Sequence, residues 1–502
     1  MVRMKLPLRA ALGKFSREPS RPGGRNLFYI LGGIVFLAFL LQSGRTKASS
    51  EGSPMGLFVT HLPIVVEYYP REETVFGIEA RELTAEGGLI QIDQTNSTWT
   101  RRNGISWESV EPSEGLRNWS ALADLEDELL NANQSGMEMI LIVRETPAWA
   151  QAILGYSCGP ILPEKLNAFA NFMHDLVERY SVPPYEVKYW EIWNEPDVAP
   201  TQVEDPNGVY GCWGDPTQTN FGGDYFAEML EAIYPQIKLA DPNAKVIIGG
   251  LLLDCDPGIP GACTSPYGGA PSRFLTGILS HSGANDGHLF LDGVAIHAYD
   301  HYENVVGAYG NTNWGSHWNT TGPVSIAKKN YVEGILDGFG VTDKFIMNTE
   351  SALIGDCCPE EPAFELTKAY YVAQSYSAAL AEDFTANVWF NILGWRNSGL
   401  VHPNLSPRLA YLAFTASRSI LQDADPLGPI SSADISPSQG VAGYKFSRNK
   451  KEIWILWSRD GVTRQISLVP GEPSQTLSVF GAPLSPTATP VIQLEPIYFI
   501  WN

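Results

Sequence analysis

Residues 137–194 contain the pattern that decides the fold. A β-rich run, Met137-Glu138-Met139-Ile140-Leu141-Ile142-Val143-Arg144, is followed by a helical pattern at 163–180 and by a second β-rich run at 187–194, Val187-Lys188-Tyr189-Trp190-Glu191-Ile192-Trp193-Asn194. Both runs are largely apolar, which is typical of parallel strands buried on both faces. A helix between two such strands predicts a βαβ unit.

The same alternation extends in both directions along the chain. Six further β-rich runs lie at 75–80, 97–103, 245–250, 291–297, 344–349 and 386–392. Helical patterns separate them, the clearest at 119–133, 223–240, 324–339 and 363–382, and another at 406–421 follows the eighth run. The crossover at 81–96 is the weakest because it contains Gly87 and Gly88. Eight strands, each followed by a helix, predict an α/β protein with a (β/α)8 TIM barrel over residues 75–421.

The pattern changes after about residue 422. Short β-rich runs separated by Gly and Pro turns lie at 441–446, 452–457, 464–468, 476–479 and 497–501. Such runs predict a small C-terminal antiparallel β domain, similar to a β-sandwich, over residues 422–502.

The N-terminus has the features of a targeting segment. A basic tail at 1–26 precedes an apolar segment at 27–44, and a Ser-, Gly- and Pro-containing linker follows at 45–74. Basic residues keep the tail in the cytoplasm, so the rest of the chain is predicted to be extracytoplasmic. We favour a single-span membrane anchor at the cell surface, because Arg45 and Lys47 crowd a cleavage site. A cleaved signal peptide, giving a secreted protein, and a buried core helix are the alternatives.

Cysteine use agrees with export. None of the six cysteines has clear zinc-ligand spacing, so we expect disulfides in loops and no metal site. Cys255 and Cys263 are near enough in sequence to close a local loop. The other cysteines are Cys158, Cys212, Cys357 and Cys358.

The charge of the chain argues against nucleic acid as a partner. The formal net charge is −21, and residues 1–47 have nine basic residues and one acidic residue. The remainder therefore has a net charge near −29, which would repel phosphates. Membrane contact is expected only through the N-terminal segment.

Two glutamates end predicted strands. Strand four ends in Asn194-Glu195-Pro196, and strand seven ends in Asn348-Thr349-Glu350. Catalytic groups of TIM barrels lie at the C-terminal ends of strands, and strands four and seven lie on opposite sides of the barrel mouth. Glycoside hydrolysis needs such a pair, in which one carboxylic acid protonates the leaving oxygen and the other carboxylate attacks the sugar or activates water. A salt-bridged loop acid is the alternative for Glu195.

Other residues near strand ends complete the candidate site. Asn194 can bond a sugar hydroxyl, and His297 or Tyr299 can bond a sugar hydroxyl or the nucleophile, although His297 could instead pack in the barrel rim. An arginine of strand two can keep the nucleophile ionised, and we prefer Arg102 to Arg101. Candidate sugar platforms, with packing as the equal alternative, are Trp149, Trp389 and Trp395.

With these motifs the chain resembles clan A glycoside hydrolases over about residues 75–420. The matching motifs are Trp193-Asn194-Glu195-Pro196, Thr349-Glu350, His297-Ala298-Tyr299, and Arg102 followed by Trp107 and Val110-Glu111-Pro112. The trailing β domain is similar to that of the β-xylosidase/iduronidase family, and the cellulase family is the second choice. The resemblance implies retention of configuration, with Glu195 as acid/base, Glu350 as nucleophile and Asn194 on the sugar 2-hydroxyl.

We therefore expect a retaining glycosidase that needs no cofactor. Its substrate would be a β-linked or L-arabinofuranosyl-type oligo- or polysaccharide. One alternative is a cell-surface carbohydrate-binding barrel that has lost catalysis, and another is a transglycosylase that uses the same residues. The cysteine-bearing loops shape the substrate pocket, so the sequence predicts the reaction more closely than the sugar.

Overall fold

The computed structural model describes residues 74–263, 269–281, 287–311, 318, 322–355 and 361–502. The basic tail and the apolar segment predicted at the N-terminus lie outside the described residues, as does the linker up to residue 73. Within the described ranges, no helix is both long enough and apolar enough to cross a membrane.

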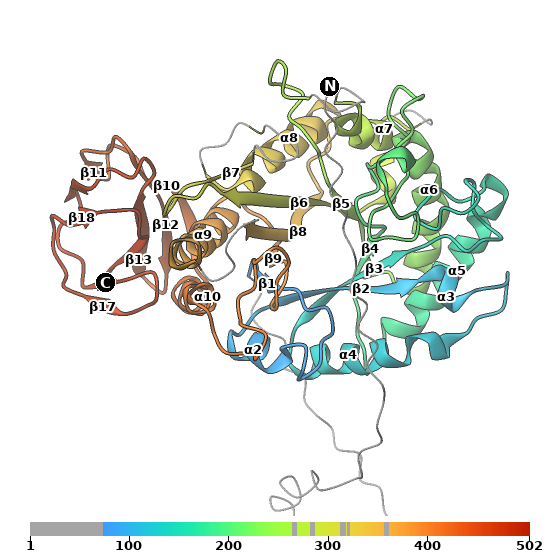
Figure 1. Ribbon diagram of the computed structural model, residues 1–502, viewed down its shortest axis with the longest axis horizontal. Coiled ribbons are helices and arrows are strands. Elements are labelled where there is room, and N and C mark those ends of the chain that lie inside the picture. The colour runs from blue at the N-terminus through green and yellow to red at the C-terminus, as the bar shows by residue number, and fades with distance from the viewer. Residues whose placement is uncertain (1–73, 264–268, 282–286, 312–317, 319–321, 356–360) are drawn as a thin grey trace, which may run out of the picture. The chain divides into compact units, whose positions relative to one another are not determined.

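Eight parallel strands close a barrel, which confirms the predicted (β/α)8 architecture (Figure 1). Each strand pairs with the next, and the last pairs with the first. The two-residue β7 (Tyr309–Gly310) runs antiparallel to the end of β6. In barrel order the strands are β1 (Phe76–Ile78), β2 (Trp99–Ser106), β3 (Glu138–Arg144), β4 (Tyr189–Ile192), β5 (Lys245–Leu251), β6 (Gly293–Tyr302), β8 (Phe345–Ile354) and β9 (Ala386–Trp389).

Helices surround the barrel (Figure 1). The Gly-containing first crossover has only the six-residue α2, and the sequence did not predict the equally short α7. The helices are α2 (Leu89–Gln94), α3 (Trp107–Val110), α4 (Ala123–Gln134), α5 (Leu166–Tyr180), α6 (Gly223–Ala240), α7 (Phe274–Leu279), α8 (Val324–Gly338), α9 (Pro362–Ala381) and α10 (Leu409–Leu421). Single 3-10 turns are η1 (Trp119–Leu122), η2 (Pro163–Lys165), η3 (Pro200–Gln202), η4 (Ala270–Arg273) and η5 (Gly287–Phe290).

The barrel interior positions the site. An apolar layer that includes Trp99 and Ala295, with Tyr189 packed against it, fills the inside of the barrel. Because side chains alternate along a strand, the residues two positions further toward the C-terminal end also point inward. These residues are Arg101, Glu191 and His297, and all three are buried. The mouth of the barrel is therefore polar above an apolar floor.

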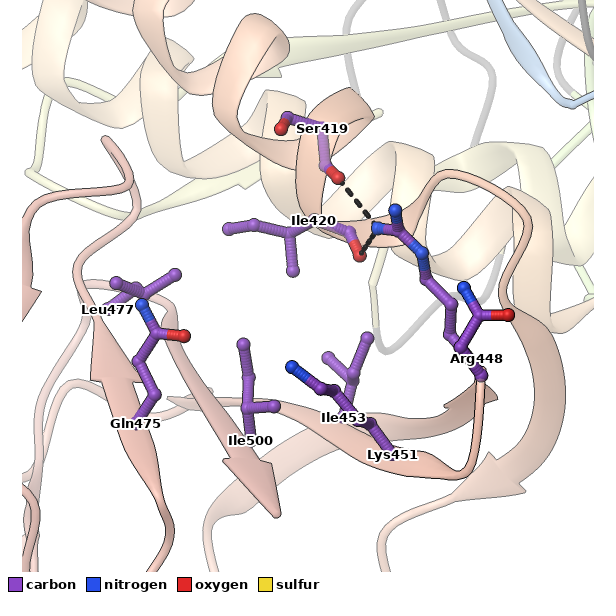
Figure 2. A pocket seen from close by; sticks show the side chains of 9 residues that line it. Ser419, Ile420, Arg448, Lys451, Ile453, Gln475, Leu477 and Ile500 are labelled. Atoms are coloured by element: carbon purple, nitrogen blue, oxygen red, sulfur yellow. Dashed lines mark hydrogen bonds between the residues drawn. The ribbon is translucent and has the colours of Figure 1, made fainter. Parts of the chain in front are cut away.

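The C-terminal region forms antiparallel sheets, as predicted, and the main sheet packs on α9 and lies against α10. Ser417 of α10 bonds the hydroxyl of Tyr498 at 2.8 Å. Arg448 donates to the carbonyl oxygens of Ser419 and Ile420 beside a cavity of about 280 Å³ (Figure 2). The main sheet contains, in order, β10 (Asp425–Pro429), β12 (Val441–Arg448), β13 (Lys451–Ser458), β19 (Ile497–Trp501), β16 (Gln475–Leu477) and β17 (Pro483–Leu484). Two-stranded sheets pair β11 (Ile435–Ser436) with β15 (Ser467–Leu468) and β14 (Arg464–Gln465) with β18 (Val491–Ile492).

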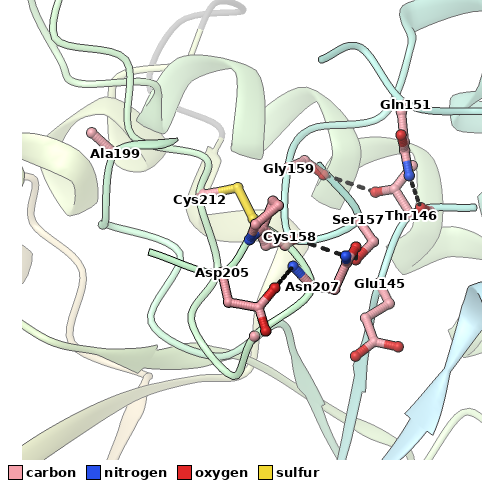
Figure 3. The surroundings of a disulfide bond; sticks show 12 residues. Glu145, Thr146, Gln151, Ser157, Cys158, Gly159, Ala199, Asp205, Asn207 and Cys212 are labelled. Carbon is pink, nitrogen blue, oxygen red and sulfur yellow. Dashed lines mark hydrogen bonds between the residues drawn. A yellow bond between two sulfur atoms is a disulfide. The ribbon is translucent and has the colours of Figure 1, made fainter. Parts of the chain in front are cut away.

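Two disulfides lie in loops at the mouth end of the strands, as expected from the sequence. Cys158–Cys212 joins the loop after β3 to the loop after β4 (Figure 3). Cys255–Cys263 closes a local loop after β5. Cys357 and Cys358 lie outside the described residues.

Candidate active site

A cleft of about 540 Å³ opens at the C-terminal ends of the strands. Its volume is within the range of small-molecule sites. Among the residues that line it are Asn194, Glu195, Tyr299, Glu350 and Arg102. The cleft therefore contains most of the residues predicted from strand ends.

Local backbone geometry aims the two glutamates into the cleft. Glu195 follows β4 with a φ of 47°, in the left-handed region that non-glycine residues seldom adopt and that is often found at functional sites. In β8 the register shifts by one residue, so that Glu350 lies opposite His297 of β6. One carboxyl oxygen of each glutamate and one ring nitrogen of His297 all lie within 4.8 Å of one another. The two carboxyl groups thus face each other across the mouth.

Glu350 is held by two hydrogen-bond donors. Arg101 Nη1 donates to Oε1 at 2.5 Å, and the hydroxyl of Tyr299 donates to Oε2. Burial raises the pKa of Glu350, but the charge of Arg101 and the hydrogen bonds from Tyr299 and Arg101 act in the opposite direction. The two donors therefore stabilise the ionised form of Glu350 and partly offset the effect of burial.

Glu195 has the opposite environment. Burial, and then the negative charges of Glu350 and Asp197, raise its pKa well above the usual range. Its neighbour is His297, whose Nδ1 lies 2.8 Å from Oε1. Glu350 accepts hydrogen bonds from a cation and from Tyr299, whereas the nearest partner of Glu195 is the neutral His297, so Glu195 holds its proton when Glu350 is ionised. Such a split between two carboxyl groups marks an acid and a nucleophile.

The protonation of His297 follows from its contacts. Burial, and then the charges of Arg101 and Lys328, lower its pKa well below the usual range, so the ring is neutral. Nε2 lies 3.3 Å from Arg101 Nη2, which can only donate. The ring proton therefore resides on Nδ1 and is donated to Glu195. Gly250 makes room for this ring, since a Cβ there would lie 2.0 Å from His297 Nε2.

The arginine that contacts Glu350 is Arg101, so the preference for Arg102 is wrong. Arg101 shares the inward-facing side of β2 with Trp99 and is 1% exposed. Arg102, the next residue, points to the outside of the barrel. Its Nε and Nη2 donate to the two carboxyl oxygens of Glu128 of α4 at 2.7 and 3.0 Å. It still lines the rim of the cleft, where its role in substrate binding stays a prediction.

Arg101 connects most of the site. Besides Glu350, it bonds Glu191 at 2.7 Å, Asn194 Oδ1 at 2.7 Å and Glu79 at 3.3 Å. Glu79 was missed from the sequence, although it lies at the end of the first predicted strand and the strand-end criterion would have found it. It lines the cleft, and burial raises its pKa to about 8.

The predicted tryptophan platforms divide into three cases. Trp389 is fully buried and donates Nε1 to the carbonyl oxygen of Ser398, so its assignment to substrate binding is wrong. Trp149 is not among the cleft-lining residues, and its ring packs on Trp107 with Lys165 Nζ over it. Trp395 does line the cleft.

Glu195, His297 and Glu350 are also close enough to be considered as metal ligands. A cation would have to displace the hydrogen bonds that Arg101 and Tyr299 donate to Glu350, and it would be repelled by the guanidinium. The arrangement therefore fits proton transfer and nucleophilic attack better than metal binding.

Comparison with known proteins agrees with the architecture. No protein-family model matches the sequence, and no curated protein matches it. A family 39 glycoside hydrolase from Bacteroides cellulosilyticus is similar in structure, with a TM-score of 0.62 and 17% identity over 87% of this chain and 82% of that chain. A GH30 endoxylanase from Clostridium papyrosolvens has a TM-score of 0.54 and 12% identity over 86% of this chain and 97% of that chain. The chain shares the fold of these hydrolases.

A third solved structure is also similar. It is a conserved exported protein from Bacteroides fragilis, with a TM-score of 0.59 and 13% identity over 86% of this chain and 98% of that chain. At these identities the likeness shows a common fold.

Proposed function

We propose that this protein is a retaining glycoside hydrolase that cleaves O-glycosidic bonds of an oligo- or polysaccharide. The observation that carries the proposal is the distance of at most 4.8 Å between carboxyl oxygens of Glu195 and Glu350. Retaining enzymes hold their two carboxyl groups about 5–5.5 Å apart, whereas inverting enzymes leave about 6.5–9.5 Å for a water molecule. The short separation supports direct attack by one glutamate.

The first step is a displacement on the sugar. Glu195, protonated because of its raised pKa, gives its proton to the glycosidic oxygen. Glu350 attacks the anomeric carbon, the bond from that carbon to the leaving oxygen breaks, and a glycosyl-enzyme forms. Arg101 and Tyr299 hold the attacking carboxylate in place.

The second step reverses the roles. Glu195, now a carboxylate, takes a proton from water as the water oxygen attacks the anomeric carbon and Glu350 departs. Neutral His297 can keep its hydrogen bond to Glu195 in both protonation states. Two inversions at one carbon give net retention.

The test is the stereochemistry of the first product. The wild type is incubated with a panel of 4-nitrophenyl glycosides that includes β-xyloside, β-glucoside and α-L-arabinofuranoside, and proton NMR follows the sugar before mutarotation. We expect the substrate's own anomer. Initial appearance of the opposite anomer would show inversion, and lack of turnover on this panel and on plant and microbial polysaccharides would favour a carbohydrate-binding barrel.

The pKa shifts predict a bell-shaped dependence of kcat/KM on pH. Activity should fall at low pH as Glu350 takes up a proton, and at high pH as Glu195 loses its proton. Since the pKa of Glu195 is raised well above the usual range of glutamic acid, the alkaline limb should lie correspondingly high. A 4-nitrophenyl leaving group needs little protonation, so Glu195→Gln should still turn over this substrate but should lack the alkaline limb. An unchanged alkaline limb in that variant would show that another group causes the loss of activity at high pH.

We also propose that the protein acts outside the cytoplasm. Two disulfides support this location, since disulfides persist mainly in oxidising compartments. The predicted N-terminal anchor would keep the protein at the cell surface. Membrane fractionation of the full chain and of a variant without residues 1–44 would distinguish an anchored protein from a secreted one.

A further inference from the structure

Tyr210, in the loop after β4, is an exposed aromatic side chain in the wall of the cleft. It is 41% exposed, and among the described residues it is the only aromatic one in the group of exposed large hydrophobic side chains. Within the described part of the chain its ring and hydroxyl make no hydrogen bond or ring contact. A partly exposed aromatic ring that stacks on no other ring in the described part of the chain, inside a candidate active site, has a face available to a ligand.

The loop that carries Tyr210 is fixed on both sides of this residue. Before it, Val209 accepts a hydrogen bond from Asn194 Nδ2 at 2.9 Å, and Gly208 accepts one from Arg144 Nη1 at 2.9 Å. After it, the amide of Gly211 donates to the carbonyl oxygen of Asn194. Only glycine allows this approach, since a Cβ on Gly211 would lie 2.7 Å from that oxygen.

The disulfide between Cys158 and Cys212 fixes the same loop at Cys212, the residue after Gly211. Cys212 is bonded to Cys158, and its amide donates to the Cys158 carbonyl oxygen at 3.0 Å (Figure 3). Earlier in the loop, Asn207 Oδ1 accepts from the hydroxyl of Ser157 at 2.9 Å. The exposed ring is therefore presented by an ordered backbone, which lowers the entropy cost of binding to it.

Contacts place Tyr210 on the acid/base side of the catalytic pair. Its loop is bonded to Asn194, the neighbour of Glu195. Burial raises the pKa of Tyr210 to about 12, and Glu195 contributes more to this shift than Glu350 does. On the other side, Trp395 lies with its ring centroid 5.8 Å from that of Tyr299, which donates to Glu350.

We propose that Tyr210 is the platform for the sugar on the leaving side of the scissile bond. The inference rests on the proposed function: the acid donates its proton to the leaving oxygen, so the leaving group lies on the side of Glu195. The C–H face of a sugar ring can pack on the exposed face of the phenol. The substrates favoured by this site would then be glycosides whose leaving group is itself a sugar.

The experiment compares Tyr210→Ala, Tyr210→Phe and wild type on two substrates of the same glycosyl unit. One is a disaccharide, which has a sugar on the leaving side, and the other is the glycosyl fluoride, which has none. The sugar is the one hydrolysed fastest in the aryl glycoside panel. The matched control is Leu154→Ala, because Leu154 is 85% exposed in the loop after β3 and is not among the cleft-lining residues.

We expect Tyr210→Ala to lower the ratio of kcat/KM for the disaccharide to kcat/KM for the fluoride roughly tenfold, mainly through KM. Tyr210→Phe should keep the wild-type ratio because it keeps the ring, and so should the Leu154 variant. A wild-type ratio in Tyr210→Ala, or an equal loss in Tyr210→Phe, would overturn the proposal. Failure of the proposed function would give a different result from failure of the Tyr210 proposal. In that case the wild type would not hydrolyse the glycosyl fluoride, or the Glu350→Ala variant would hydrolyse it as well as the wild type does.

Discussion

Replacement of Glu350 by alanine is expected to lower kcat on an aryl glycoside by a factor on the order of 10⁵, because the nucleophile is lost while the cleft remains. Added azide should restore part of the turnover, since the shortened side chain leaves room for a small anion beside the anomeric carbon. Azide would then attack in a single displacement. The product should be the glycosyl azide of inverted configuration, which NMR can identify.

Glu195→Ala is the matched variant, because it removes the same carboxymethyl group from the other side of the cleft. Here Glu350 still forms the glycosyl-enzyme from a substrate with a good leaving group, and azide then attacks that intermediate. The azide product should therefore have retained configuration. The same configuration from both variants would contradict the roles assigned to the two glutamates, and full activity of Glu350→Ala would refute the mechanism.

The features that the sequence predicted well are those that strand periodicity controls. Apolar runs that end in a polar residue indicate the barrel, its mouth and the positions of Glu195 and Glu350. The alternation of side chains along the second strand also explains why the preference for Arg102 over Arg101 was wrong. Trp99 and Arg101 are two residues apart, so a strand whose Trp faces the barrel interior must turn Arg101 toward Glu350 and Arg102 toward the helices. The spacing of Trp99 and Arg101 in the sequence therefore already indicated which arginine faces the site.

Other features depend on contacts between distant segments. The Cys158–Cys212 pairing joins two loops with no periodic pattern, and six cysteines allow about 15 pairings. Trp389 follows the eighth strand as a platform would, but its indole donates to Ser398 and is buried. Tyr210 carries no strand-end signal at all. Its position depends on the hydrogen bonds that Asn194 and Arg144 donate to the carbonyl oxygens of Val209 and Gly208, and only the folded barrel brings these groups together.

Arg101→Met should have the largest effect on stability among single changes in the site. Its guanidinium contacts the carboxylates of Glu79, Glu191 and Glu350 at 3.3, 2.7 and 2.5 Å, and the arginine is 1% exposed. Without it, Glu350 and any other ionised carboxyl group of this cluster would be buried beside one another with no cation. We expect a loss of about 3–5 kcal/mol in the free energy of unfolding near neutral pH. Activity should fall by at least about 100-fold, since Glu350 would no longer be held ionised.

The loss should depend on pH in a defined direction. Arg101 lowers the folded-state pKa values of Glu79 and Glu350 against the effect of burial, so without it the ionisation of these two groups destabilises the folded protein more strongly at high pH. As the pH falls and the groups become protonated, the penalty disappears. The deficit of the variant relative to wild type, measured by denaturant unfolding, should therefore be larger at about pH 8 than at about pH 5.

Arg102→Met is the control for this stability measurement, because it makes the same substitution one residue along β2. The side chain of Arg102 is 22% exposed, and Glu128, although buried, keeps the hydrogen bond from the amide of Leu83, so we expect a smaller loss of about 1–2 kcal/mol. Equal losses in the two variants, with the same pH dependence, would mean that the buried cation does not offset the charges of the site. A large pH-dependent deficit confined to Arg101→Met would instead identify this residue as the counter-ion that allows the carboxylate of Glu350 to exist at the bottom of the cleft.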